Sequence, residues 1–187
     1  MALPADYNGV TTLNFSDKIC SFTGYRFKKL YESIGDGGIA GLKDIILDEL
    51  RELTAGDFSV FQCGMALGSD MIFADAVLKL KREYPRLKFI AAIPCLNQEK
   101  TWNENQKTHY RHLLDSADEV RLISESEYFD GCMQMRNRHL VDTCDLLLAV
   151  FDGKRGGTMQ TVEYAKKRGK KISIIDPSTL LRITPMG

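Results

Sequence analysis

Short apolar runs of strand length alternate along this chain with segments whose apolar residues recur every three or four positions. The runs at residues 87–93 and 146–151 are almost continuously apolar, which is typical of strands covered on both faces. The apolar runs predict strands at residues 18–23, 58–63, 87–93, 118–123, 146–151 and 171–175.

Helical spacing fills most of the intervals between these runs. It predicts helices at residues 42–53, from about 69 to 84, around Tyr110, from Arg136 to Cys144 and at 159–167. The alternation of strand and helix predicts an α/β fold with a doubly wound, mostly parallel sheet between two layers of helices. The glycine-containing stretch between Gly24 and Gly41 is expected to be a flexible polar loop that covers a site.

One domain accounts for the whole pattern. It is predicted to span residues 18–176, with an N-terminal arm at 1–17 and a C-terminal tail at 177–187.

In open α/β sheets, ligands bind beyond the carboxyl ends of the strands, so the strand-to-helix turns are the candidate sites. The turn after the strand at 146–151 contains Gly156, Gly157 and Thr158 directly before a helix. N–H groups at a helix N-terminus bind anions, and glycines let a phosphate approach them closely. The alternative is a plain turn whose glycines only satisfy the backbone. The turn does not match the Walker A or Gly-x-Gly-x-x-Gly patterns, so ATP hydrolysis and standard NAD binding are disfavoured.

Two further turns carry candidate ligand-binding residues, namely Thr23, Gly24 and Arg26 after the first strand and Gly64, Gly68, Ser69 and Asp70 after the second. Asp70 suits a ribose hydroxyl, although Ser69 or Asp70 is equally able to cap the following helix. The second turn also lacks the Walker A pattern.

Side chains suited to a nucleotide follow the later strands. Arg136, in the first turn of its helix with Asn137 beside it, suits a phosphate or a developing charge, the alternative being a surface arginine. Trp102 is suited to stack on a base while Gln98 forms a hydrogen bond with that base. The alternative is that Trp102 makes an aromatic contact that holds the start of the helix in place. Pro94 ends its strand at the same edge.

Charge and composition limit the kinds of partner that the protein is expected to bind. Lys plus Arg and Asp plus Glu are 25 each, so no strong basic field is available and nucleic-acid binding is not favoured. The five cysteines lack zinc-ligand spacing and are predicted to be small buried thiols. We expect no metal site and no cofactor. With no signal peptide and no run of membrane-spanning length, the protein is expected to be soluble and cytoplasmic.

The ordered set of motifs resembles the YpsA-like proteins of the SLOG superfamily, which also contains the lonely-guy phosphoribohydrolases and the DNA-processing protein DprA. The resemblance covers about residues 18–176 and rests on Thr23-Gly24-Tyr25-Arg26, the Gly-Met-Ala-Leu-Gly-Ser-Asp run at 64–70, Ile93-Pro94 with Gln98 and Trp102, Arg136-Asn137 with Val141-Asp142 and Asp145, and Gly156-Gly157-Thr158. It implies a Rossmann-like fold, a homodimer and a small-molecule ligand that is a nucleoside phosphate or ADP-ribose-like.

Two functions are left open by this resemblance. In the lonely-guy enzymes an arginine at a helix start and a glutamate after the Gly-Thr turn cleave the N-glycosidic bond of a nucleoside 5′-monophosphate. Arg136 is similar to that arginine, but Thr161 stands in the place of the glutamate and Glu163 is turned from it by about 200° on a helix. Binding or sensing of the nucleotide is therefore the preferred hypothesis. The alternative is hydrolysis by Arg136 with Asp70 or Glu163.

Overall fold

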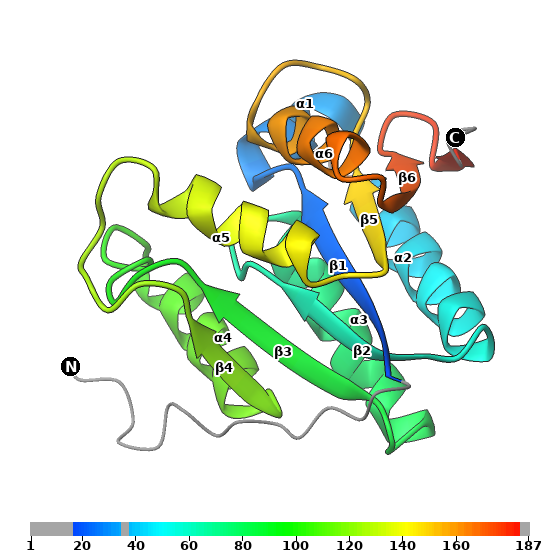
Figure 1. The fold of residues 1–187 in the computed structure, drawn as a ribbon, viewed down its shortest axis with the longest axis horizontal. Helices are drawn as coiled ribbons and strands as arrows, with labels where there is room; N and C mark the ends of the chain where they lie inside the picture. The colour runs from blue at the N-terminus through cyan, green and yellow to red at the C-terminus, as the bar shows by residue number, and fades with distance from the viewer. Residues whose placement is uncertain (1–16, 35–37, 184–187) are drawn as a thin grey trace.

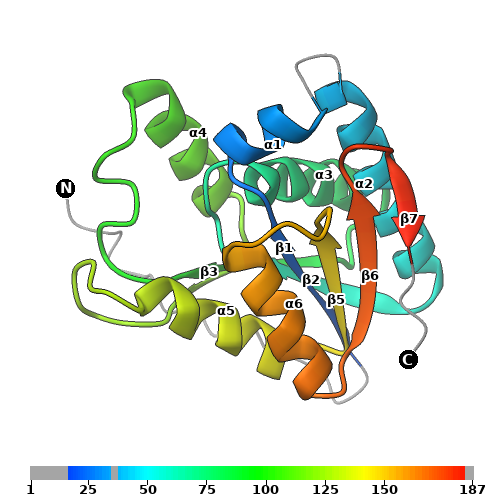
Figure 2. The same ribbon diagram turned by 90° about the horizontal axis from the view of Figure 1, so that it is seen from above.

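The computed structural model describes residues 17–34 and 38–183, and these form three layers, a sheet between two layers of helices (Figures 1 and 2). The strands are β1 (Lys18–Gly24), β2 (Phe58–Cys63), β3 (Lys88–Ile93), β4 (Glu119–Leu122), β5 (Leu146–Val150), β6 (Lys171–Asp176) and β7 (Leu181–Ile183). The helices are α1 (Phe27–Ile34), α2 (Gly38–Ala55), α3 (Ser69–Glu83), α4 (Glu104–Asp115), α5 (Cys132–Asp142) and α6 (Gly157–Lys167). The predicted α/β class is confirmed.

The order of the strands places a switch point between β1 and β5. The described residues form one sheet in the order β4-β3-β2-β1-β5-β6-β7, parallel from β4 to β6 and antiparallel at β7. From β1 the chain winds outward to β4 and then returns to lay β5 on the other side of β1. Helices α2, α3 and α4 lie on one face and α5 and α6 on the other (Figure 2). A reversal of this kind opens a crevice at the carboxyl ends of the two strands.

Aromatic and aliphatic packing fixes both faces of the sheet. On one face, Phe22 of β1 stacks on Phe73 of α3 with 4.4 Å between the ring centroids, and Phe61 meets Phe73 edge-on. On the other face, Val162 of α6 packs in a cluster with Leu147 of β5. Burial on both sides explains why β3 and β5 are almost continuous apolar runs.

The six predicted strands and the five predicted helices are confirmed, with ends that shift by a few residues. All five cysteines are free and buried, as predicted.

Two elements were not predicted. Residues 27–34 form α1 and α2 already begins at Gly38, so the expected flexible loop between Gly24 and Gly41 is wrong there. The stretch expected as a tail contains β7, which pairs with β6. Apart from Asp17, the predicted N-terminal arm lies outside the described residues, as do residues 184–187.

Candidate functional site

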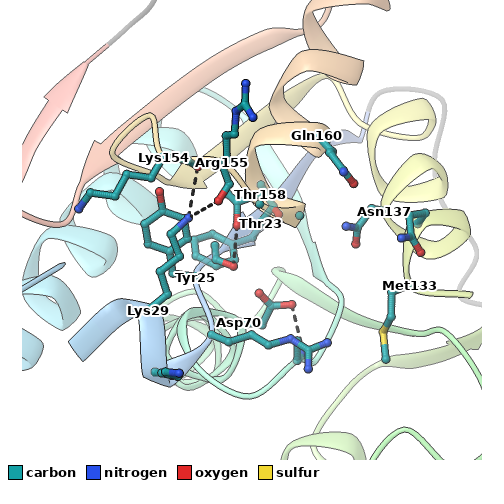
Figure 3. Close-up of a pocket in the computed structure, with 18 of the residues that line it drawn as sticks. Thr23, Tyr25, Lys29, Asp70, Met133, Asn137, Lys154, Arg155, Thr158 and Gln160 are labelled. Atoms are coloured by element: carbon teal, nitrogen blue, oxygen red, sulfur yellow. Dashed lines mark hydrogen bonds between the residues drawn. The ribbon is translucent and has the colours of Figure 1, made fainter. Parts of the chain in front are cut away.

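A cavity of about 460 Å³ lies at the switch point, where the carboxyl ends of β1 and β5 meet (Figure 3). Its walls come from the end of β1, from α1, from the start of α5 and from the loop between β5 and α6. The expected ligand residues that line it are Thr23, Gly24, Arg26, Asp70, Arg136, Asn137, Gly156, Gly157 and Thr158. We call this space the first cavity.

The N-terminus of α6 opens into the first cavity. Gly156 and Gly157 are exposed, and Gly156, at φ 153° and ψ −172°, provides no side-chain cap for the helix. The hydroxyl of Thr158 donates to the carbonyl of Gly24 at 3.1 Å, which attaches this turn to the end of β1. Because the first N–H groups of a helix lack intrahelical acceptors, the turn presents donors to the cavity.

Lys29 of α1 holds the loop that precedes this turn. Its ammonium donates to the carbonyls of Lys154 and Arg155 at 3.2 and 2.8 Å, and lies 4.1 Å from the ring centroid of Tyr25 (Figure 3). Two carbonyl acceptors and an aromatic face fix the position of this charge. The β5–α6 loop therefore depends on a helix far away in the sequence.

Asp152, in the same loop, makes a second connection to β1 and α1. It accepts hydrogen bonds from the Tyr25 hydroxyl and from Ser33, and its carboxylate lies 2.6 Å from the Lys154 ammonium. Burial opposes ionisation of Asp152, but these donors outweigh it and hold the pKa of its carboxyl well below the ordinary value. Burial and the bond to Asp152 raise the pKa of Tyr25, which keeps this hydroxyl a donor.

The floor of the first cavity contains a buried charge pair. Arg136 is only 4% exposed, donates to the carbonyl of Gly64 and lies 3.9 Å from Asp70. Burial lowers the pKa of the Arg136 guanidinium and raises that of the Asp70 carboxyl, and each charge opposes the shift of the other. The alternative of a solvated surface arginine is therefore wrong.

Three of the expected ligand residues instead hold the turn after β2 in place. A Cβ at Gly68, where φ is 117°, would lie 2.5 Å from the carbonyl oxygen of Tyr25. Ser69 donates to that same oxygen through its N–H at 3.0 Å and its hydroxyl at 2.9 Å. A Cβ at Gly64 would overlap the Arg136 guanidinium. None of the three residues lines the first cavity.

A second cavity of about 470 Å³ adjoins the first and contains the remaining nucleotide candidates, Gln98 and Trp102. Arg26 and Met133 border both cavities. Trp102 packs edge-on against Tyr110 at 5.1 Å between centroids, so it supports the start of α4 and also faces the second cavity. Pro94 follows the last residue of β3 and lines neither cavity.

Glu163 does not line the first cavity, whereas Arg136 does. Glu163 lines a third cavity of about 380 Å³ between α5 and α6, which shares Gln134, Asn137, Gly157 and Gln160 with the first, and it forms an ion pair with Lys166 at 3.0 Å. Thr161, which stands in the glutamate's place, is buried and accepts a hydrogen bond from Asn137 at 2.9 Å. Asn137 in turn accepts a hydrogen bond from Arg136 at 2.8 Å.

The sequence-based predictions missed the contribution of α1 and the β5–α6 loop, namely Lys28, Lys29, Glu32, Ser33, Lys154 and Arg155. A signal was present, because Phe27, Leu30, Tyr31 and Ile34 have the i, i+3, i+4, i+7 spacing of a helix face. This helix is short and largely polar, with only Leu30 buried. The glycines that follow it therefore led to the prediction of a loop.

Residues 20–180 match YpsA, the YspA SLOG family. The chain belongs to this family. The SPbeta prophage-derived protein YoqJ of Bacillus subtilis is 34% identical over 138 residues, which cover 67% of this chain and 81% of YoqJ. A UPF0398 protein of Halalkalibacterium halodurans is 31% identical over 172 residues, covering 90% and 88% of the two chains.

Solved structures of DNA processing protein A (DprA) share the fold of this YpsA-family chain. The protein from Streptococcus pneumoniae aligns with a TM-score of 0.63 and 18% identity, covering 86% of this chain and 50% of DprA. The protein from Helicobacter pylori, studied for its single-stranded DNA binding mode, aligns with a TM-score of 0.59 and 17% identity, covering 86% and 66%. The chain thus spans between half and two thirds of these DprA chains, and the likeness establishes the Rossmann-like fold alone.

Within residues 17–34 and 38–183, none of the helices combines the length and apolar character needed to cross a membrane. The same part of the chain contains no cluster of three or more His, Cys, Asp and Glu side chains able to hold a metal ion.

Proposed function

We propose that the first cavity binds a phosphate-bearing nucleotide, with its phosphate at the N-terminus of α6. The observation that carries this proposal is the exposed turn at Gly156 and Gly157, which opens into a cavity at the switch point of the sheet. The N–H groups of this turn have neither a side-chain cap nor an intrahelical acceptor, so a bound anion would complete their hydrogen bonding.

The local charge also favours an anion. Cationic residues along the first cavity outnumber acidic ones, with Arg26, Lys28, Lys29, Arg136, Lys154 and Arg155 against Glu32 and Asp70. The chain as a whole has no net charge, so this excess is specific to the cavity. A concentrated positive field with free N–H donors suits a phosphate better than a neutral ligand.

Family membership supports a nucleotide over other phosphate esters. The SLOG resemblance implies a nucleoside phosphate or an ADP-ribose-like molecule, and the DprA of Helicobacter pylori binds single-stranded DNA. A short oligonucleotide therefore belongs among the ligands to be tested. The homodimer implied by the resemblance stays a prediction.

Replacement of Gly157 by proline tests a single N–H group. Gly157 is the first residue of α6, where proline is tolerated, and a Cβ there meets nothing within 4 Å. We expect Gly157→Pro to weaken the binding of AMP and ribose 5-phosphate by about tenfold or more, because a charge-assisted hydrogen bond is lost. Isothermal titration calorimetry measures both affinities.

The matched control is Gly157→Ala, which adds a side chain but keeps the N–H group and should bind like the wild type. Equal affinities for the proline variant and the wild type would refute a phosphate at this turn. Binding of a thymidine oligonucleotide without binding of AMP would instead identify a groove for single strands.

Hydrolysis of a nucleoside 5′-monophosphate is the second candidate, and Asp70 is the observation that favours it. Its buried carboxyl has a raised pKa and lies beside Arg136 at the cavity floor, an arrangement that suits proton donation to a departing base. Chromatography of the AMP samples distinguishes the two candidates. Release of adenine that Asp70→Asn abolishes would establish hydrolysis, whereas unchanged AMP would leave binding as the function.

A further inference from the structure

The second cavity adjoins the first. It lies between the β3–α4 segment and the loop before α5, and Arg26 and Met133 border both spaces. A hydrogen bond of 2.8 Å from the N–H of Tyr128 to the side chain of Asn97 joins its two walls. The two cavities are therefore neighbours, with Arg26 and Met133 between them.

Gln98, one of the residues that line the second cavity, has an unpaired acceptor. The residue is 7% exposed, and its amide nitrogen donates to the carbonyl of Met65 at 2.7 Å. Because a carbonyl only accepts, this contact fixes which end of the amide carries the nitrogen. The opposite end, Oε1, is buried and has no hydrogen-bond partner. Buried acceptors are nearly always paired, so an orphan beside a cavity points to a missing donor.

Aromatic side chains from both walls border the same space. Trp102 is partly buried and held by its edge-on contact with Tyr110, so its ring has a fixed orientation. Tyr128, which is 58% exposed, lines the cavity from the other wall. A planar heterocycle gains stacking energy on rings of this kind, whichever base it is.

We propose that the second cavity holds the base of the nucleotide, and that Gln98 Oε1 accepts a hydrogen bond from a base N–H or amino group. This inference rests on the proposed function, because the phosphate at α6 fixes the other end of the ligand. It defines the substrate class as a nucleotide whose base stacks on Trp102 and carries a donor on its edge. Gln98 is then the residue that discriminates among bases.

Trp102 provides a direct probe, since it is the only tryptophan in the 187 residues. We expect AMP to quench its fluorescence on binding, and ribose 5-phosphate to bind in calorimetry with no change in fluorescence. Binding of AMP without quenching would overturn the base subsite while leaving the phosphate site intact. Failure of both ligands to bind would refute the phosphate site, and this inference with it.

A matched pair of ligands tests the role of Gln98. AMP and purine riboside 5′-monophosphate have the same ring system, but only AMP carries an amino group. A panel with GMP, CMP and UMP covers the donors of the other bases. We expect at least one base with a donor to bind about fivefold or more tightly than the purine riboside. We expect this preference to vanish in Gln98→Met.

Affinity for ribose 5-phosphate shows whether Gln98→Met has disturbed the first cavity. If it is unchanged while the base preference disappears, Gln98 is a specificity residue. A uniform loss for all ligands, or no preference in the wild type, would overturn its assigned role. Tyr128→Ala, at an exposed loop position, should weaken AMP but not ribose 5-phosphate and tests the stacking surface without risk to the core.

Discussion

Arg136 and Gly64 depend on each other. The guanidinium lies against the backbone of Gly64 and donates to its carbonyl, in the space that a Cβ would occupy. Asp70, 3.9 Å away, supplies the opposing charge. The middle of α5 is thus fastened to the turn after β2, since Arg136 is the fifth of its eleven residues. Glycine at position 64 makes room for a neighbouring side chain rather than for a ligand.

Gly64→Ala should therefore destabilise the protein. We expect a loss of about 1–3 kcal/mol in the free energy of unfolding, because the added methyl group displaces a buried, hydrogen-bonded guanidinium. Urea denaturation measures the loss. Gly157→Ala is the matched control, since a Cβ there meets nothing within 4 Å. Equal stability of the two variants would contradict this packing.

At the scale of elements, α1 and the β5–α6 loop act as one unit. Lys29 and Ser33, one turn apart on α1, bond respectively to the loop carbonyls and to Asp152. With only Leu30 buried, α1 has little apolar contact with the core. The position of the loop, and of the turn that begins α6, thus rests on polar contacts made by a short helix.

Lys29→Met should loosen this loop. The substitution keeps the length of the side chain but removes both hydrogen bonds to the loop carbonyls. We expect amide hydrogen exchange at residues 154–158 to accelerate about threefold or more, with little change in global stability. Lys28→Met removes a neighbouring positive charge of the first cavity and is the control. Similar acceleration in both variants would show that charge, rather than the tether, holds the loop.

The geometry of α6 illustrates what helical periodicity can predict. Thr161 and Glu163 differ by two positions, and the predicted turn of about 200° places them on different faces. In the structure the Thr161 hydroxyl accepts a hydrogen bond from Asn137 and Glu163 pairs with Lys166, although both residues line the third cavity. Glu163 does not line the first cavity, whereas Asp70 does and is the carboxylate that lies beside Arg136 there.

For the whole molecule, Asp152 links stability to pH by connecting β5, β1 and α1. Burial opposes its ionisation, yet the bonds from Lys154, Tyr25 and Ser33 lower the pKa of its carboxyl from the ordinary value of 3.8. A carboxyl with a lower pKa in the folded state stabilises the fold above its unfolded pKa, and this contribution is lost as the pH falls.

We expect Asp152→Asn to be less stable than the wild type by about 1–3 kcal/mol at neutral pH, with the difference shrinking below about pH 4. Denaturation curves recorded from neutral pH to about pH 3 measure this dependence. Asp48→Asn is the control, since its carboxylate is 67% exposed and surface ion pairs contribute little. A constant difference across the pH range would contradict the linkage.

Much of the fold could be predicted from the spacing of apolar residues, because an element that is buried on one or both faces has apolar residues at regular intervals. The strand at 58–63 was predicted with the observed ends, and α2 to α6 were found. The short α1 and β7 were missed because they bury few side chains. Of the site, the edge of the sheet and the Gly156 turn were predictable, since parallel strands all end at one edge.

The sequence by itself determined the layers, the alternation of strand and helix, and the strand-to-helix turns that carry the candidate ligand-binding residues. Only the tertiary structure decided which turn residues face a cavity and which face a neighbour. Gly68 and Ser69 were turned toward Tyr25, and Arg136 toward Gly64. The reason is that periodicity records whether a position is buried, whereas the partner of a glycine or a charged side chain is set by strands distant in sequence.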